Sequence, residues 1–468
     1  MEKHQFSFPE NDIYMMEYGN MFLGNTMWMN SGKGFEETTF DLVVRDLPNK
    51  NWGFLLMYGL DRFLTYVKNY SFTKEDVEVL LKLNLISPKH AKYYRNFKFL
   101  GDVWSIDEGV PFFAGEPIVR VSGPLWQVNL FTALALNAFS YPVRVLTKGA
   151  RVKIAAGNKM VAPGVNVVRS QGFEQVVICQ KASYLTGDAS TTQPNFYKEN
   201  REFLSDDLYF QPNINHATIK SYSDEREAFK AAIRDILPNS TMLQIMIDTY
   251  NLKNGLRILI EELKKLPKRE QEKLKIPIDS GDLLKTSKYI RKELDKNGLD
   301  HVGIMAYSNL NEYKIQKLES KRSPIEYYIC ITEVVNVSDA PVLEQVYKMS
   351  ELRYPGGKIE YKAKLVKGKE SYPGRKQIFR LYSVNGKMQK DIIGLEHENL
   401  GEPLLRQYLK KGQRVIKPED IRETRKRIQN NLIKIPDSLK NIYAKRKYDV
   451  KLSQDLKNLY KQVEKQHL

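Results

Sequence analysis

The feature that most constrains this chain is a run of four strand-and-helix units that begins at Leu243. Short apolar or β-branched segments alternate with amphipathic segments whose apolar residues recur at helical spacing. Strands that are separated by helices pair in parallel, so the run predicts an α/β fold with a parallel sheet or barrel. The predicted strands are Leu243–Ile247, Leu274–Ile278, Val302–Ala306 and Ile325–Ile331, and the predicted helices are Leu252–Leu266, Leu283–Leu294 and a short one through Ile315 and Leu318.

Acidic residues follow two of these strands. Asp248 comes after the first strand, and Asp279, Ser280, Gly281 and Asp282 come after the second. Loops at the carboxyl ends of parallel strands meet at one edge of a sheet, so the three aspartates are expected to line one pocket. Two carboxylates around a glycine offer a charge pair for a metal ion and a bare backbone for a phosphate. The alternative is that these aspartates only cap the helices that follow.

The sequence on both sides of this run predicts a second domain built around an antiparallel sheet. Residues 100–123 and 360–393 form short runs punctuated by glycine and proline, with turns at Pro373-Gly374 and Asn385-Gly386. Two apolar helices, Leu125–Ala138 and Val143–Ala156, lie between the first of these regions and the parallel run. The predicted division is a sheet domain from residues 1–140 and 356–400, an α/β domain over 141–355 that carries the site, and a basic helical tail over 401–468.

The charge of the chain is uneven. Its 468 residues carry a net charge of +17, and residues 401–468 alone hold 18 basic and 8 acidic side chains, a net charge of +10. In this tail Arg422, Arg425, Lys426 and Arg427 alternate with apolar residues as on a solvated helix face, which is the ordinary explanation for such a pattern. The alternative is that the tail contacts nucleic acid.

The composition also predicts the compartment. No apolar run reaches the roughly 18 residues that a membrane-spanning helix needs. The segment Met1–Glu10 contains charged residues and no apolar block, unlike a secretory signal. Cys179 and Cys330 each lie in an apolar run, which favours buried thiols over a disulfide. A cytoplasmic protein without a membrane partner is therefore expected.

Short motifs over nearly the whole chain occur in the order and spacing of one enzyme family. They are Asn11–Tyr14, Phe99–Trp104, Glu108-Gly109, Glu116-Pro117, Thr147–Val152, Ile278–Leu283, Asn311–Ile315, Asp339–Pro341, Val346–Lys348, Pro373–Gln377 and Glu402–Leu405. In these motifs the chain resembles the nicotinate phosphoribosyltransferases.

This resemblance implies a fold and a reaction. Members join nicotinate to phosphoribosyl pyrophosphate, giving nicotinate mononucleotide for NAD salvage, with Mg²⁺ and coupled ATP hydrolysis as the expected cofactors. The implied fold is an incomplete α/β barrel of the type II phosphoribosyltransferase kind beside an open-faced antiparallel sheet domain built from both chain ends. The implied assembly is a homodimer with shared active sites.

The resemblance also implies roles for single residues. His216 matches the histidine that is phosphorylated by ATP, and Asp248, Asp279 and Asp282 match acids around the ribose and the metal, with Asp279 and Asp282 as the metal ligands. Tyr14 matches an aromatic residue that stacks on the pyridine ring from the neighbouring subunit. The remaining substrate-binding positions are Lys148, Arg151, Arg169, Ser280, Gly281 and Arg375.

The departures from the family pattern concentrate where the resemblance places the anions. Ile329 and Ile331 replace two glycines, Glu333 replaces an arginine, and Pro277 replaces another arginine. Other replacements are Ser308, Asn309, Glu344, Gln345, Pro212 and Asn213. Losing an arginine removes a bidentate anion contact, and a side chain in place of glycine closes the approach to backbone amides. Two interpretations stay open: a divergent enzyme, or a catalytically lapsed homologue that serves as a structural or scaffold protein with a basic surface.

Overall fold

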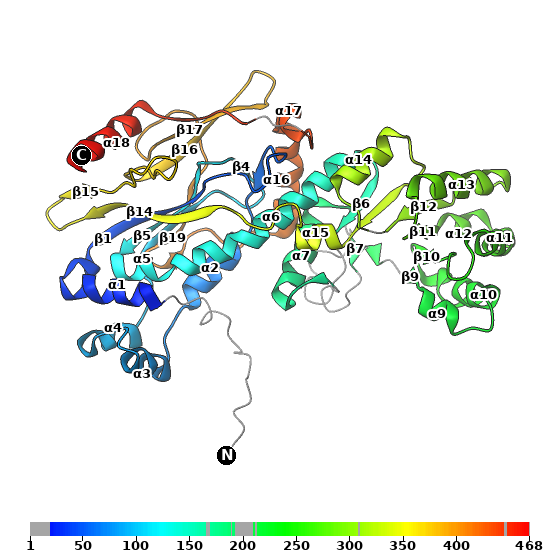
Figure 1. Ribbon diagram of the computed structural model, residues 1–468, viewed down its shortest axis with the longest axis horizontal. Coiled ribbons are helices and arrows are strands. Elements are labelled where there is room, and N and C mark those ends of the chain that lie inside the picture. The colour runs from blue at the N-terminus through cyan, green and yellow to red at the C-terminus, as the bar shows by residue number, and fades with distance from the viewer. Residues whose placement is uncertain are drawn as a thin grey trace, which may run out of the picture. The chain divides into compact units, whose positions relative to one another are not determined.

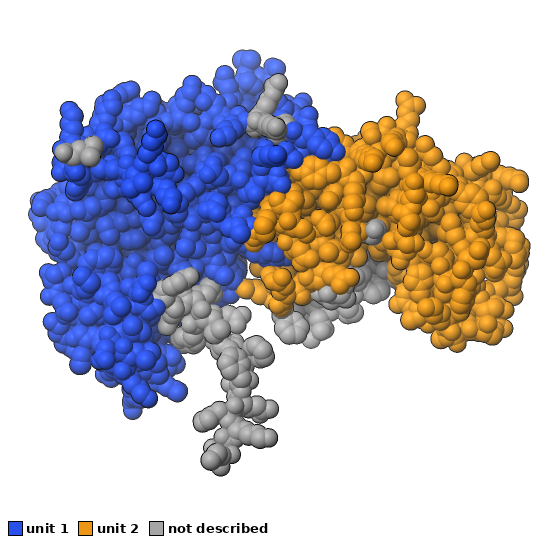
Figure 2. All heavy atoms as spheres, viewed as in Figure 1, with its two compact units in different colours: residues 1–143, 342–419, 430–468 blue, residues 144–341, 420–429 orange. Residues whose placement is uncertain are grey.

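The computed structural model describes residues 19–164, 169–188, 190–191, 209–210, 213–307, 309–443 and 447–467. The chain divides into two compact units, coloured separately in Figure 2. Unit 1 comprises residues 1–143, 342–419 and 430–468, and unit 2 comprises residues 144–341 and 420–429.

Unit 2 is built on a curled half-barrel sheet in which all six strands run parallel, and helices connect successive strands (Figure 1). The strands in spatial order are β6 (Met160–Pro163), β13 (Tyr327–Cys330), β12 (Gly303–Ala306), β11 (Leu274–Ile278), β10 (Leu243–Ile245) and β9 (Asn213–Ile214). The helices between them are α9 (His216–Lys220), α10 (Glu225–Asp235), α11 (Leu252–Leu263), α12 (Lys268–Glu272), α13 (Leu283–Lys296), α14 (Glu312–Ser320) and α15 (Thr332–Asn336), and α7 (Phe173–Thr186) follows β6.

This sheet confirms the predicted parallel run. β11 covers the predicted residues, while β10, β12 and β13 are shorter than predicted by one or two residues at an end. Strands β6 and β9 add one strand to each edge of the predicted four. They have only four and two residues, and periodicity does not distinguish such short segments from loops.

Unit 1 contains two main sheets, the larger with strands from both ends of the chain, and a two-stranded sheet of β2 (Leu55–Leu56) and β4 (Pro111–Phe112). The larger sheet is antiparallel, with the order β15 (Ile359–Tyr361), β14 (Gln345–Arg353), β1 (Glu37–Val44), β5 (Pro117–Pro124), β3 (Asp102–Ser105), β19 (Arg406–Lys410) and β20 (Gln413–Arg414). The smaller has the order β18 (Glu402–Pro403), β16 (Lys376–Tyr382), β17 (Met388–Leu395) and β21 (Val450–Leu452), with β21 parallel to β17. Its helices include α1 (Gly19–Asn30), α2 (Leu60–Asn69), α3 (Lys74–Lys82), α4 (Ala91–Arg95) and α5 (Leu125–Leu130).

The prediction of two helices broken near residue 140 is wrong. The chain breaks at Phe131 and then continues as one helix, α6 (Thr132–Ala156), with Pro142 in its interior. Proline leaves the carbonyl four residues earlier, that of Ala138, without its helical donor. A Cβ atom on Gly59 would lie 2.4 Å from the Ala138 oxygen, so only glycine permits the chain to pass this point of the helix.

The stretch from residue 401 is not helical throughout. It begins with strands β18, β19 and β20, and the helices α16 (Ile421–Lys434), α17 (Asp437–Lys440) and α18 (Gln454–His467) follow. The helical pattern of the later residues obscured the short strands: β18 pairs with β16, β19 pairs with the distant β3, and β20 pairs with β19 in a hairpin. Among the described residues, no helix has the length and apolar character to cross a bilayer.

Candidate active site

The candidate site lies at the carboxyl edge of the unit 2 sheet. His216 follows β9, Asp248 follows β10 and Asp279 follows β11. These strands are parallel neighbours, so the three side chains come to the same edge although 63 positions separate the first from the last. The side chain of Asn215 accepts a hydrogen bond from the Thr218 amide and caps α9, which starts the helix at His216.

The histidine ring is held from both nitrogens. Its Nε2 lies 3.6 Å from Asp279 Oδ2 and 3.9 Å from Asp248 Oδ1, and its Nδ1 is 3.0 Å from the Thr249 hydroxyl oxygen. Ser280 donates a 3.4 Å hydrogen bond to the other oxygen of Asp248. The ring therefore has a defined orientation with Nε2 directed at two carboxylates.

Asp248 is an acid of this cluster whose pKa is shifted. Its partial burial and, secondly, the charge of Asp279 raise the pKa of Asp248 above its ordinary value, while His216 acts in the opposite direction. A raised carboxyl pKa produced by burial and a like charge is typical of functional sites.

His216, Asp248 and Asp279 could also hold a divalent cation. Each offers a ligand atom within 4.8 Å of the others, and Asp248 Oδ1 is buried without a hydrogen-bond partner. Carboxylate oxygens suit Mg²⁺, and a ligand whose orientation is fixed by its own hydrogen bonds binds more firmly. The donor set therefore fits the cation that the sequence predicted, with His216 present in the group.

Asp282 has another contact. Its carboxylate accepts hydrogen bonds of 3.1 Å from the amides of Leu284 and Lys285 and caps α13, which is the alternative that the sequence left open for these aspartates. Gly281 has φ +69° and open space where a Cβ would stand, so its backbone is accessible.

Lys148 and Arg151 lie in a separate, buried ion cluster. Both project from α6, and both side chains are almost fully buried. Lys148 Nζ is 2.6 Å from both Glu312 and Asp339, and Arg151 Nε donates a 3.0 Å bond to Glu312. In this structure the two bases therefore neutralise acids of their own unit.

The other predicted positions are dispersed. Arg375 belongs to unit 1, where it pairs with Glu37 and lies 2.9 Å from Glu351. Arg169 is exposed on unit 2. Tyr14 lies outside the described residues.

The substituted positions lie in β13 and at the start of α15. Ile329 is within β13 and buried with Met305 and Tyr327 in an apolar cluster, and Ile331, directly after the strand, packs against it. Glu333 lies in the first turn of α15. Bulky apolar side chains and a carboxylate at these positions offer a phosphate neither a bare backbone nor a cation.

Several residues near the site were missed by sequence reasoning. The sequence does not single out Thr249, yet its hydroxyl group orients His216. Tyr307 donates its phenolic hydrogen to Gln244, and Asn213 lies 3.5 Å from the same phenol. A buried glutamine in the apolar strand β10 was the available signal for this contact.

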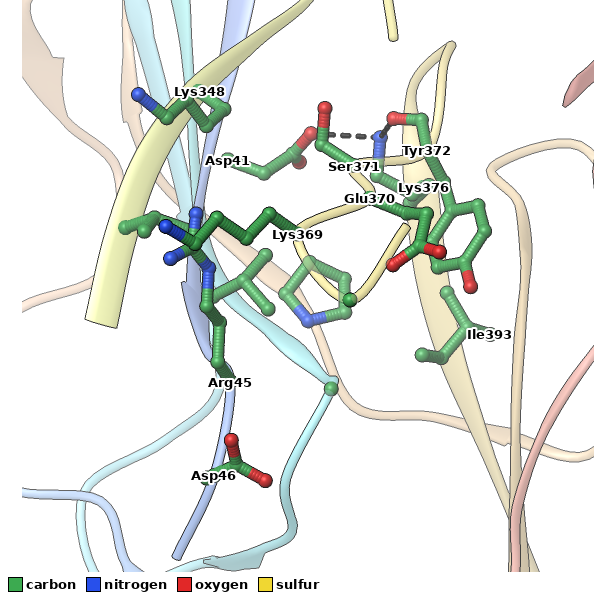
Figure 3. A pocket seen from close by; sticks show the side chains of 15 residues that line it. Asp41, Arg45, Asp46, Lys348, Lys369, Glu370, Ser371, Tyr372, Lys376 and Ile393 are labelled. Atoms are coloured by element: carbon green, nitrogen blue, oxygen red, sulfur yellow. Dashed lines mark hydrogen bonds and ion pairs between the residues drawn. The ribbon is translucent and has the colours of Figure 1, made fainter. Parts of the chain in front are cut away.

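Unit 1 contains a basic pocket that the sequence also did not indicate. The pocket has a volume of about 250 Å³ and is lined by Arg45, Lys348, Lys369 and Lys376, among others (Figure 3). Lys376 is neutralised by Asp41 at 2.7 Å. Burial and, after it, the charges of Lys364 and Arg45 lower the pKa of Lys348, and the carboxylates of Asp46 and Glu370 are also among the lining residues.

Comparison with known proteins identifies the family. Residues 11–140 match the sequence model of the nicotinate phosphoribosyltransferase N-terminal domain, and residues 399–460 match that of the C-terminal domain. A nicotinate phosphoribosyltransferase of Mycobacterium tuberculosis is 32% identical over 381 residues, covering 80% of this chain and 77% of the relative. The Bacillus subtilis nicotinate phosphoribosyltransferase is 26% identical and covers 95% of this chain and 92% of its own length.

The fold agrees with the sequence comparison. The crystal structure of human nicotinic acid phosphoribosyltransferase superposes with a TM-score of 0.78 at 21% identity, covering 97% of this chain and 99% of the human one. With the motifs of the sequence, the half-barrel and the histidine–aspartate cluster in place, these matches show that the chain belongs to the nicotinate phosphoribosyltransferase family.

Proposed function

We propose that this protein joins nicotinate to phosphoribosyl pyrophosphate, giving nicotinate mononucleotide and pyrophosphate for NAD salvage in the cytoplasm. The observation that carries the proposal is the convergence of His216, Asp248 and Asp279 at one sheet edge in a chain of this family. The finer fold assignment, the incomplete barrel of the type II phosphoribosyltransferases, is part of the same proposal.

The carboxylates suit the bond changes of this reaction. The pyridine nitrogen uses its lone pair to form a bond to the anomeric carbon, while the bond from that carbon to the pyrophosphate oxygen breaks and its electrons leave with pyrophosphate. No base is needed because the attacking nitrogen carries no proton to remove. Positive charge develops on the ribose, and Asp248 and Asp279 can stabilise it from fixed positions.

His216 is proposed as the residue that couples ATP hydrolysis to synthesis. Its support is the family match together with the fixed ring, because a nucleophilic nitrogen must be oriented before it can accept a phosphoryl group. Asp248 and Asp279 would hold Mg²⁺ while His216 Nε2 stays free to accept the phosphoryl group, and Asp282 remains a proposed ligand only if its cap is released. When bound, this cation supplies positive charge for the pyrophosphate group.

The phosphate groups need cations from positions other than the altered turn after β13. Arg45, Lys348 and Lys369 of the basic pocket are proposed for this role, in addition to Lys148, Arg151, Arg169 and Arg375. We place the pocket and Tyr14 at the active site of a second subunit in a homodimer, with Ser280 and Gly281 on the ribose side. This assignment rests on the family resemblance and on the positive charge of the pocket.

The alternative of a lapsed enzyme with a nucleic-acid-binding tail has less support. In α16, Arg422 is 2.6 Å from Asp420 and Lys426 is 2.8 Å from Glu423, so acids in the same region neutralise these bases.

The test is binding of the phosphorylated substrate. Phosphoribosyl pyrophosphate with Mg²⁺ should raise the melting temperature, because a ligand that binds only the folded state stabilises it. An Asp279→Asn variant should lose most of this shift. An unchanged melting temperature at millimolar phosphoribosyl pyrophosphate would contradict the proposal and favour the scaffold.

A further inference from the structure

A second pocket of unit 1 combines exposed aromatic rings with lysines, and none of the described residues that line it is a carboxylate. It has a volume of about 480 Å³, and its lining includes Phe35, Lys92, Tyr93, Lys98, Leu100 and Trp126. Three of these apolar side chains are substantially exposed: Phe35 (44%), Tyr93 (36%) and Leu100 (61%). Exposed aromatic residues that gather in one hollow mark a binding surface more often than isolated ones do.

The aromatic rings of this pocket are fixed by contacts with one another and with a buried tryptophan. Phe35 and Tyr93 have ring centroids 5.0 Å apart, and Tyr93 contacts the buried Trp126 at 6.4 Å. The side chain of Gln127 accepts a hydrogen bond from the Leu100 amide and donates one to the Lys98 carbonyl. The pocket wall is therefore preorganised, which reduces the entropy that a ligand must overcome on binding.

The surrounding charge is positive and unpaired. Lys33, Lys92, Arg95 and Lys98 are exposed, and within the described part of the chain none of them forms an ion pair with a carboxylate. Lys92 Nζ lies 5.2 Å from the centroid of the Tyr93 ring. A further pocket lies beside α16. Carboxylates are among the residues that line it and among those that line the basic pocket of Figure 3, so both differ from this aromatic pocket.

We propose that this aromatic pocket binds single-stranded nucleic acid. Bases stack on exposed aromatic faces without sequence preference, and neighbouring lysines contact the phosphates. The +17 charge of the chain favours a polyanion over a small anion as the ligand. A base would stack on Phe35 and Tyr93, and adjacent phosphates would lie beside Lys92 and Lys98.

The experiment is fluorescence anisotropy with the full chain and a labelled 12-nucleotide oligo(dT), from 50 to 200 mM salt. Tyr93→Ala should weaken binding about tenfold, because a base loses its stacking partner, and Tyr93→Phe should bind like the unmodified protein. The double change Lys92→Gln and Lys98→Gln should reduce the slope of log affinity against log salt by about 1.4, since each phosphate contact contributes about 0.7 for single strands.

Matched controls use the same residue types elsewhere on unit 1. Tyr443→Ala removes an aromatic side chain that is 57% exposed, and Lys457→Gln removes an exposed lysine of α18; neither should alter binding. The proposal is overturned if Tyr93→Ala binds normally, or if only the change of Arg422 and Lys426 to Gln in α16 weakens binding. It is equally overturned if dTMP or an acidic dodecapeptide competes as well as the unlabelled 12-mer.

Discussion

At the scale of single residues, the orientation of His216 is the feature with the most direct consequence. Thr249 holds one ring nitrogen and two carboxylates face the other. His216→Ala should abolish the stimulation of nicotinate turnover by ATP, a loss of at least about tenfold. Thr249→Val should give a smaller loss, because the ring remains but is less restrained.

The control for this series is His397→Ala, which removes an exposed histidine of unit 1. Turnover with and without ATP is the measurement, and it should be unchanged in the control. Equal ATP stimulation in His216→Ala and the unmodified protein would contradict the proposed role of His216.

The charged carboxylate of Asp248 should lower the free energy of unfolding although it is needed in the active site. Its pKa is raised by burial and then by Asp279, so the folded chain binds this proton more tightly than the unfolded chain. Stability therefore falls as the pH rises from the ordinary pKa of aspartate through the raised value, and the loss persists at neutral pH. Asp248→Asn should melt about 1 to 3 °C higher at pH 7, with a difference that shrinks in acid, and should be inactive. A lower melting temperature at pH 7 would show that the charge is instead stabilised by His216.

At the scale of elements, the buried ions between α6 and α14 distinguish a structural role from a substrate-binding one. Lys148→Met leaves Glu312 and Asp339 without their shared cation, and should cost about 3 to 5 kcal/mol of folding free energy. Adding Glu312→Gln should restore part of this loss, since the two changes act on one contact. Thermal unfolding measures both effects. Normal stability of Lys148→Met with weakened binding of phosphoribosyl pyrophosphate would instead make Lys148 a substrate ligand.

The elements also show what the sequence could and could not predict. The strands of the parallel run could be predicted because each is a short segment rich in apolar residues that is followed by a helix with an apolar face. The join within α6 could not, because the close approach of Gly59 to Ala138 and Pro142 joins segments about eighty positions apart.

The same limit applies to the candidate site. Its aspartates could be placed from the strand ends, and His216 from the family motif. The contacts of Thr249, Tyr307 and Gln244 depend on which way side chains point across neighbouring strands, and the burial of Lys148 and Arg151 depends on acids far along the chain.

At the scale of the whole molecule, the proposed homodimer predicts complementation between subunits. A chain with Asp279→Asn and a chain with Lys348→Gln and Lys369→Gln should each be inactive alone. Random mixing of dissociated subunits should restore about a quarter of the normal activity, because half of the dimers are mixed and each has one intact site. Lys410→Gln in place of the second chain is the control for subunit exchange. Recovery no greater than the sum of the separate variants would contradict a site shared between subunits.

The most direct test of the central claim is the conversion of isotope-labelled nicotinate by the pure protein with phosphoribosyl pyrophosphate, Mg²⁺ and ATP. We predict labelled nicotinate mononucleotide and an equal amount of pyrophosphate, and no product from the Asp279→Asn variant. Labelled nicotinate that stays unconverted by a folded, dimeric protein would contradict the proposed activity and favour the scaffold.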